Sequence, residues 1–179
     1  KIEPEKLLTR ISMGFQDVYL FKDTIYNNIK VGNREAAREE VEQAAKQACC
    51  HEFIMKMPLG YDTPVGEGGC TLSGGEKQRI SVARALLKDA PIVLLDEATA
   101  ALDPENELQI QHAINALVRQ KTVVIIAHRL KTIKDADQII VLDNGKTVQR
   151  GTHNQLLQED GLYSRLWNLQ QQSAGWSMQ

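Results

Sequence analysis

The sequence predicts an α/β protein with a mostly parallel sheet, and three consecutive segments carry this prediction. Residues 92–95 and residues 122–127 are almost wholly apolar runs, as expected of strands that are buried on both faces. Residues 105–119 lie between them and space their apolar side chains as an amphipathic helix does. The order strand, helix, strand is typical of parallel strands that are connected by covering helices.

The composition is that of a soluble globular domain and excludes several classes of protein. The chain has 179 residues, of which 42% are apolar and 25% charged, which is enough for a core of its own. A net charge of −2 gives no basic field, so nucleic acid is not an expected partner. The three cysteines (Cys49, Cys50 and Cys70) are odd in number and have no zinc spacing, which favours a reducing compartment. The sequence contains no signal peptide and no apolar run long enough to span a bilayer.

The first part of the chain is predicted to contain a helix, a strand and a second helix. Residues 4–8 begin with proline, which is favoured in the first turn of a helix. Residues 10–15 are partly apolar and predict a strand that ends at Gln16. Residues 17–29 mix apolar and polar positions irregularly, so we expect a loop and a short helix that pack two aromatic side chains inward.

The middle of the chain is predicted to be mainly helical. Residues 34–49 form the clearest amphipathic helix, with charged residues on the face opposite the apolar one. A short helix over residues 51–57 stops before Pro58, and residues 60–69 have the glycine and polar content of a loop. A third helical run covers residues 79–88. The apolar face of the first of these helices consists of Val41, Ala44, Ala45 and Ala48.

The last part of the chain is predicted to form a hairpin and two helices. Residues 89–91 break the chain after the third helical run, and the two apolar strands with the helix between them follow. The sequence Asp-Asn-Gly then lies between residues 138–142 and 146–149 and is typical of a tight hairpin turn. Thr152 is expected to cap the first of two closing helices. From Gln170 the chain is polar, and we expect a frayed tail.

Residues 72–78, Leu-Ser-Gly-Gly-Glu-Lys-Gln, open the helical run at 79–88 with an unusual first turn. Ser73 and Glu76 have the spacing of a capping box, in which each side chain accepts a hydrogen bond from the other residue's backbone amide. The two glycines leave backbone amides uncovered, and the N-terminal end of a helix attracts anions. An ordinary capped helix explains the same residues, so this pattern alone leaves an anion site and a structural cap as alternatives.

Polar residues follow both of the apolar strands. Asp96 and Glu97 end the strand at 92–95, and His128 ends the strand at 122–127. Ligands of open parallel sheets bind beyond the carboxyl ends of the strands. Adjacent residues of an extended chain point to opposite sides, so one carboxylate could hold Mg²⁺ while the other acts as a general base. The structural alternatives are a solvated acidic pair and a packed or surface histidine.

Five motifs occur in a fixed order and together indicate a family. They are Gln16, LSGGEKQ at 72–78, IVLLDE at 92–97, AALD at 100–103 and His128. Their order strongly resembles the nucleotide-binding domain of ABC transporters, where the corresponding motifs are the Q-loop, the signature, Walker B with its catalytic glutamate, the D-loop and the switch histidine. Residues 63–68 resemble the loop that contacts the coupling helices of the transmembrane domain in exporter-type members.

The resemblance implies an ATPase whose nucleotide is held between two such domains in head-to-tail orientation. Glu97 and His128 are then the expected catalytic residues, and Gln16 and Asp96 are the expected ligands of Mg²⁺. Without the resemblance, Asp103 is explained as a turn or N-cap residue of the helix at 105–119. Contacts to ATP are expected from Gln16, Ser73, Gly74, Gly75, Glu76, Gln78 and Asp103.

The resemblance also implies a fold and a division of the chain. The fold is the C-terminal part of a P-loop NTPase fold, with a mostly parallel sheet, flanking helices and an inserted α-helical subdomain. Residues 1–16 would end the first half of the ATPase core with the Q-loop, and residues 17–90 would form the α-helical subdomain up to the signature helix. Residues 91–170 would form the second half of the core with the C-terminal helices, and residues 171–179 would form a flexible tail.

One motif of this family, the P-loop G-x-x-x-x-G-K-[ST], does not occur in these 179 residues. The P-loop uses backbone amides and a lysine to hold the β- and γ-phosphates. Because the family places it upstream of the Q-loop, we expect it before Lys1. We therefore expect this chain to be a fragment that hydrolyses no ATP by itself.

Partners and location are expected from the resemblance alone. The first partner is a second nucleotide-binding domain, identical or paralogous. The second is a transmembrane domain outside this chain, which is expected to contact the Gln16 region and the 63–68 loop. The expected location is the cytoplasmic face of the cell (inner) membrane. One alternative is a catalytically incomplete half-domain that only lends its signature, which the presence of Glu97 and His128 disfavours. Another is a soluble, non-transport ABC ATPase, which the near-neutral charge and the exporter-like loop disfavour.

Overall fold

The computed structural model describes residues 3–14, 18–66, 70–96 and 104–174. The chain divides into two compact units, residues 1–126 and residues 127–179, and each unit has its own hydrophobic core. The division expected from the family motifs, with boundaries after residues 16, 90 and 170, stays a prediction. None of the helices in the described part of the chain is both long and apolar enough to cross a lipid bilayer.

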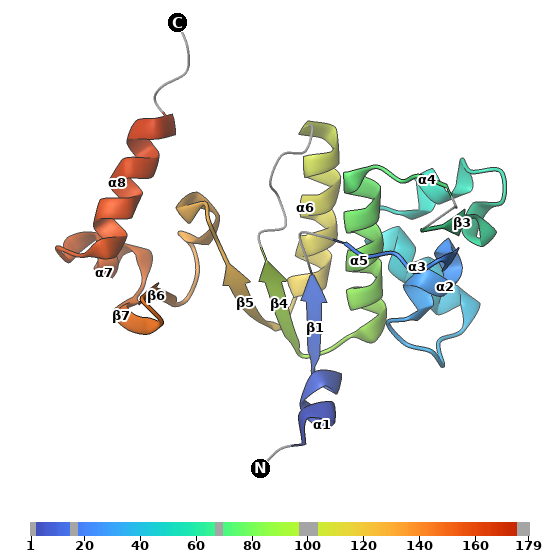
Figure 1. The fold of residues 1–179 in the computed structure, drawn as a ribbon, viewed down its shortest axis with the longest axis horizontal. Coiled ribbons are helices and arrows are strands. Elements are labelled where there is room, and N and C mark those ends of the chain that lie inside the picture. Colours follow the sequence, from blue (N-terminus) through green and yellow to red (C-terminus); the bar gives the residue numbers. More distant parts are fainter. Residues whose placement is uncertain (1–2, 15–17, 67–69, 97–103, 175–179) are drawn as a thin grey trace, which may run out of the picture. The chain divides into compact units, whose positions relative to one another are not determined.

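The first unit has a parallel sheet, a small antiparallel ribbon and six α-helices among its described residues (Figure 1). Its elements are α1 (Pro4–Thr9), β1 (Ile11–Gly14), β2 (Asp23–Thr24), α2 (Ile25–Lys30), α3 (Arg38–Gln47), α4 (His51–Met55), the 3₁₀ turn η1 (Gly60–Asp62), β3 (Pro64–Val65), α5 (Gly74–Lys88), β4 (Ile92–Asp96), α6 (Pro104–Val118) and β5 (Thr122–Ile126).

The parallel sheet confirms the α/β fold expected from the sequence. Its strands lie in the order β1-β4-β5, with Ile11 beside Ile92 and Asp96 beside Ile126. Val93 and Leu95 in the central strand β4 are buried, whereas Ile92 and Leu94 on its other face are only partly buried, so the expected burial on both faces is met on one face. Because all three strands run in the same direction, their carboxyl ends meet at one edge of the sheet.

Helix α5 joins the sheet to the helices of the first unit. It packs against β1 and α6 and also against α2 and α3, so it lies at the centre of the unit (Figure 1). Its side chains Ile80, Val82 and Ala83 belong to a core that includes the expected apolar face of α3, with Val41, Ala44, Ala45 and Ala48 all buried. Helix α3 begins at Arg38, four residues later than expected, because the Glu40 carboxylate accepts a hydrogen bond from the Ala37 amide and fixes the start there.

The close approach of α2 to α5 predicts a stability effect. A Cβ atom at Gly32 would lie 2.2 Å from the backbone oxygen of Arg84, which belongs to α5 and cannot move aside. Replacing Gly32 with alanine is therefore expected to destabilise the fold by about 1–3 kcal/mol, the usual cost of overpacking a well-packed site. Thermal unfolding of the wild type and of Gly32→Ala measures this loss of stability. Gly74→Ala is the control, since no atom lies within 4 Å of the added Cβ, and equal unfolding midpoints for wild type and Gly32→Ala would contradict the prediction.

Two expectations for the chain around strands β2 and β3 are wrong. Leu20 before α2 and Ile25 and Ile29 within it are buried, but Tyr19 is 72% exposed and Phe21 is 47% exposed, where two inward aromatic side chains were expected. The two rings pack edge to face at 5.3 Å, and the Phe21 ring covers the guanidinium of Arg84. Residues 60–69, expected to be a loop only, also contain strand β3, which pairs with β2.

Strand β5 is not the buried strand that its apolar sequence predicts. Val124, Ile125 and Ile126 are between 44% and 60% exposed. Among the described elements, β5 packs extensively only against β4, so its side chains, which point out of the two faces of the sheet, are left without a covering helix.

The second unit consists of a hairpin and two helices, as expected. Its elements are η2 (Leu130–Ile133), β6 (Ile139–Asp143), β7 (Lys146–Gly151), α7 (His153–Gln158) and α8 (Leu162–Ala174). Asn144 and Gly145 both have positive φ angles, as a tight hairpin turn requires. The Thr152 side chain caps α7 by accepting from the Gln155 amide. Helix α8 continues past Gln170, where a frayed tail was expected, and the Gln170 side chain accepts from the Leu130 amide and donates to the His128 carbonyl.

Candidate functional site

The N-terminal end of α5 has the capping box that the sequence predicts. The Ser73 hydroxyl accepts from the Glu76 amide at 3.3 Å, and the Glu76 carboxylate accepts from the Ser73 amide at 2.8 Å. Ser73 and Gly74 are exposed, whereas Gly75 and Gln78 are buried. Because α5 is a regular helix of 15 residues, its first turn presents the positive end of the helix dipole to solvent.

Gly74 leaves this first turn open. A Cβ atom at Gly74 would meet no atom within 4 Å, so the glycine is not required by packing. Glycine in a helix costs about 1 kcal/mol relative to alanine, which makes its presence here unfavourable for stability alone. Exposed amides at a helix N-terminus bind phosphate groups in many proteins. The geometry therefore suits contact with an anion that approaches from outside this chain.

Asp96 lies at the carboxyl end of the central strand, as expected. It is the last residue of β4 and is exposed, and it lies in register with Ile126 at the end of β5. Strand β1 ends at Gly14 on the same edge, beside Leu95. Gln16, Glu97 and Asp103 lie outside the described residues. In the described ranges, no three His, Cys, Asp or Glu side chains come together as a potential metal site.

His128 belongs to the second unit. Its side chain is exposed, and its backbone carbonyl accepts from the Gln170 side chain at 2.7 Å. Gln170 also accepts from the Leu130 amide at 2.9 Å, so α8 holds the backbone on both sides of Arg129, directly after His128. No local sequence pattern predicts this support, because 42 residues separate the two partners.

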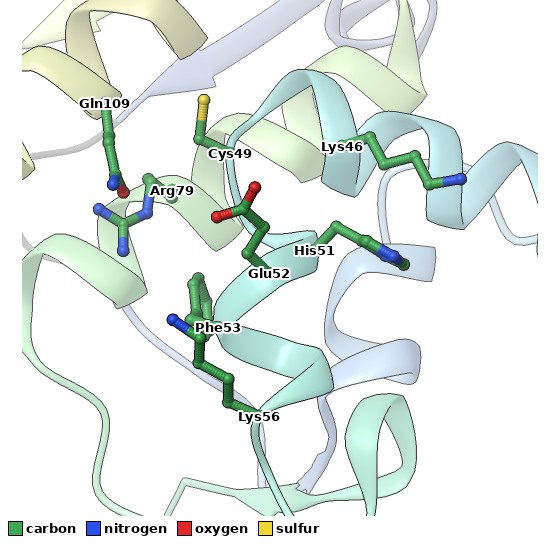
Figure 2. A pocket seen from close by; sticks show the side chains of 8 residues that line it. All are labelled: Lys46, Cys49, His51, Glu52, Phe53, Lys56, Arg79 and Gln109. Carbon is green, nitrogen blue, oxygen red and sulfur yellow. The ribbon is translucent and has the colours of Figure 1, made fainter.

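A hollow of about 560 Å³ lies beside α5, between α3, α4 and α6 (Figure 2). The Arg79 guanidinium lies over the Phe53 ring at 5.2 Å. The Glu52 carboxylate points toward the same side as Arg79, whereas Lys46 and His51 point away (Figure 2). Among the described residues, none that is expected to bind ATP or Mg²⁺ lines this hollow. Its described lining consists of Lys46, Cys49, His51, Glu52, Phe53, Lys56, Arg79 and Gln109.

The described parts of the two segments expected to contact a transmembrane domain approach each other. Asp23 pairs with Val65 and Thr24 with Pro64, so residues shortly after the Q-loop position form a ribbon with the start of the 63–68 loop. A Cβ atom at Gly66 would lie 2.9 Å from the Phe21 carbonyl oxygen, which shows how closely they approach. The exposed rings of Tyr19 and Phe21 belong to the same segment.

The parallel sheet, the capped helix with its open first turn and the carboxylate at the strand end define the class of nucleotide-binding α/β domains. A family profile described as "ABC transporter" matches residues 2–100, so the chain belongs to the ABC transporter family. This confirms the resemblance seen in the motifs.

Individual relatives are exporters or related ATP-binding proteins. The ATP-dependent lipid A-core flippase of Legionella pneumophila (strain Paris) is 53% identical over 93% of this chain and 28% of the flippase. An uncharacterised ABC transporter ATP-binding protein of Sinorhizobium fredii is 51% identical over 92% of this chain and 28% of its own length. The structure of a bacterial Atm1-family ABC exporter with ATP bound matches with a TM-score of 0.82 and 48% identity, over 93% of this chain and 29% of the exporter. This chain thus spans less than a third of the proteins it matches, and its fold is that of an ABC exporter nucleotide-binding domain.

Proposed function

We propose that this chain is part of the ATP-binding and ATP-hydrolysing domain of an ABC exporter, in which closure of two such domains moves a substrate across a membrane. The observation that carries this best is the likeness to an exporter with ATP bound, at 48% identity over 93% of the chain. The open first turn of α5 supports it, because a phosphate is the ligand that such a helix end suits.

The signature residues contact a nucleotide that a second domain holds. In the proposed head-to-tail dimer, Ser73, Gly74 and Gly75 close over the γ-phosphate at the positive end of α5. The exposure of Ser73 and Gly74 in this chain supports this, since both are accessible to a partner. Glu76 keeps the Ser73 backbone in place through the capping box. Asp103 and Gln78 are the remaining proposed contacts, and Gln78, which is buried in this chain, reaches the nucleotide only if the start of α5 rearranges in the dimer.

The carboxyl ends of the strands carry the hydrolytic residues. A bound Mg²⁺ would neutralise charge on the β- and γ-phosphates. The donor set fits this ion, because Gln16 and Asp96 offer the oxygen ligands that Mg²⁺ prefers. Glu97 accepts a proton from the attacking water, and His128 contacts the γ-phosphate and stabilises the developing charge.

A transmembrane domain is the second proposed partner. The ribbon of β2 and β3 and the exposed rings of Tyr19 and Phe21 offer it one continuous surface. This arrangement would place the chain at the cytoplasmic face of the inner membrane. The domain division into residues 1–16, 17–90, 91–170 and 171–179 belongs to the same proposal.

The function is tested by comparing the full-length protein with the isolated chain. The full-length protein is expected to hydrolyse MgATP, whereas residues 1–179 are expected to show no steady hydrolysis, because they contain no P-loop to hold the β- and γ-phosphates. Phosphate release over time measures both. The Glu97→Gln form of each protein reports contaminating ATPases, and steady hydrolysis by residues 1–179 above that control would contradict the prediction. A full-length protein that hydrolyses no MgATP would refute the proposed function.

A further inference from the structure

Asn28 is a fully buried polar residue that organises the segment around Tyr19 and Phe21. Its amide oxygen accepts from the Phe21 backbone amide at 2.9 Å, and its amide nitrogen donates to the Phe21 carbonyl at 3.0 Å. The same nitrogen donates to the Thr24 carbonyl at 2.9 Å. Asn28 is 0% exposed, so these bonds replace contacts with water that the side chain has lost.

Arg84 connects this segment to helix α5. Its Nε donates to the Asn28 carbonyl at 2.6 Å, one terminal nitrogen donates to the Tyr19 carbonyl at 2.8 Å, and the other donates to the Asn28 side-chain oxygen. The guanidinium also lies over the Phe21 ring at 5.5 Å. Burial lowers the pKa of Arg84, yet an arginine stays protonated at neutral pH. The three donor nitrogens of the planar guanidinium thus bind three oxygens of residues 19–28 (the Tyr19 carbonyl, the Asn28 carbonyl and the Asn28 side-chain oxygen). We call this arrangement the clamp, and a lysine could not reproduce its planar geometry.

The clamp acts on the same rigid body as the signature. Arg84 follows Gly74 by ten residues in one uninterrupted helix, a distance of about 15 Å along the axis. Helices α2 and α5 pack directly on one another (Figure 1). A displacement of the Tyr19 and Phe21 backbone therefore reaches the first turn of α5 through hydrogen bonds and a single helix.

We infer that Asn28 and Arg84 are positioning residues that tie the exposed Tyr19–Phe21 surface to the signature at the start of α5. This inference rests on the proposed function, in which that surface meets a transmembrane domain and the signature meets a phosphate. The clamp makes the orientation of the signature depend on what contacts Tyr19 and Phe21. Asn28 and Arg84 themselves do not touch the nucleotide.

Hydrogen–deuterium exchange of the full-length protein in phosphatidylethanolamine and phosphatidylglycerol nanodiscs, without nucleotide, tests the tie. In Arg84→Lys, backbone amides of residues 19–22 and of residues 73–77 are expected to exchange faster together. The kcat for MgATP is expected to fall about tenfold with the KM within about twofold, because small misplacements of a reacting geometry lower the chemical rate.

Lys88→Gln is the matched control on the same helix. Lys88 donates to the Leu8 and Ile11 carbonyls at 2.8 and 2.7 Å, so its loss also removes bonds from α5 but none to the Tyr19 segment. It is expected to leave exchange at residues 73–77 and the kcat unchanged. Asn28→Asp provides a second variant if Arg84→Lys does not fold, since aspartate cannot donate to the Phe21 and Thr24 carbonyls.

The exchange pattern decides the inference independently of ATP hydrolysis. Faster exchange at residues 19–22 alone, with residues 73–77 and the kcat as in wild type, would overturn it and leave Asn28 and Arg84 with a local packing role. Coupled faster exchange at both segments would support it. A wild-type protein without ATPase activity would count against the proposed function only, because the exchange measurement uses no nucleotide.

Discussion

Replacing Glu97 with glutamine in the full-length protein is expected to lower ATP turnover by a factor of about 10² to 10⁴, the range that a general base contributes. Glutamine keeps the size and one oxygen of the side chain but cannot accept a proton from water. Asp96, the residue before it, ends β4 at the edge where ligands of parallel sheets bind. ATP binding is expected to persist, because the phosphate and Mg²⁺ contacts lie on other residues.

Two measurements on the same preparation separate chemistry from binding. Phosphate release reports turnover, and a fluorescent ATP analogue reports binding. Glu39→Gln is the matched control, since Glu39 is exposed on α3 in the described structure and the substitution makes the same chemical change. Full turnover in Glu97→Gln would remove the role as general base from this residue.

The elements that the sequence predicted correctly are those with a local signal. The start of α5 follows from Ser73 and Glu76, whose capping bonds connect residues only three positions apart. The hairpin follows from Asn144 and Gly145, which tolerate positive φ angles. The central strand β4 follows from its apolar run, since it lies between β1 and β5 and buries Val93 and Leu95, although Ile92 and Leu94 on its other face are only partly buried.

The elements that were missed depend on contacts between distant residues. Asn28 and Arg84 are 56 positions apart, and nothing in either local sequence shows that they share hydrogen bonds. Arg84 is also what contacts the half-exposed Phe21 ring, whose partner lies 63 positions away in the sequence. Strand β5 has the apolar sequence of a central strand, but burial depends on neighbouring strands that its own sequence does not specify.

The candidate site was predictable as a set of motifs, whereas its assembly was not. Ser73 and Asp96 lie where the sequence placed them, at a helix start and at a strand end. The support of the His128 backbone by Gln170 depends on the packing of α8 against the preceding turn. Gln16, Glu97 and Asp103 lie outside the described residues, so their roles stay predictions from the family motifs.

Replacing Gly74 with aspartate is expected to separate stability from function. Aspartate in the first turn interacts favourably with the helix dipole by about 0.3–1 kcal/mol, and no atom lies within 4 Å of the new Cβ. The unfolding midpoint is therefore expected to stay the same or rise. ATP turnover in the full-length protein is expected to fall about a hundredfold, because a carboxylate would occupy the end of α5 that meets the γ-phosphate in the proposed dimer.

Ala37→Asp is the control for this substitution. Ala37 is the exposed N-cap of α3, where an acidic side chain has the same favourable effect on a helix but faces no expected phosphate. Gly74→Ala separates the added volume from the added charge. If Gly74→Asp keeps wild-type turnover while its unfolding midpoint rises, the first turn of α5 is only a helix cap. If turnover falls in Gly74→Asp and stays normal in Ala37→Asp, the open glycine is explained by the phosphate it must admit, since stability alone would favour almost any other residue there.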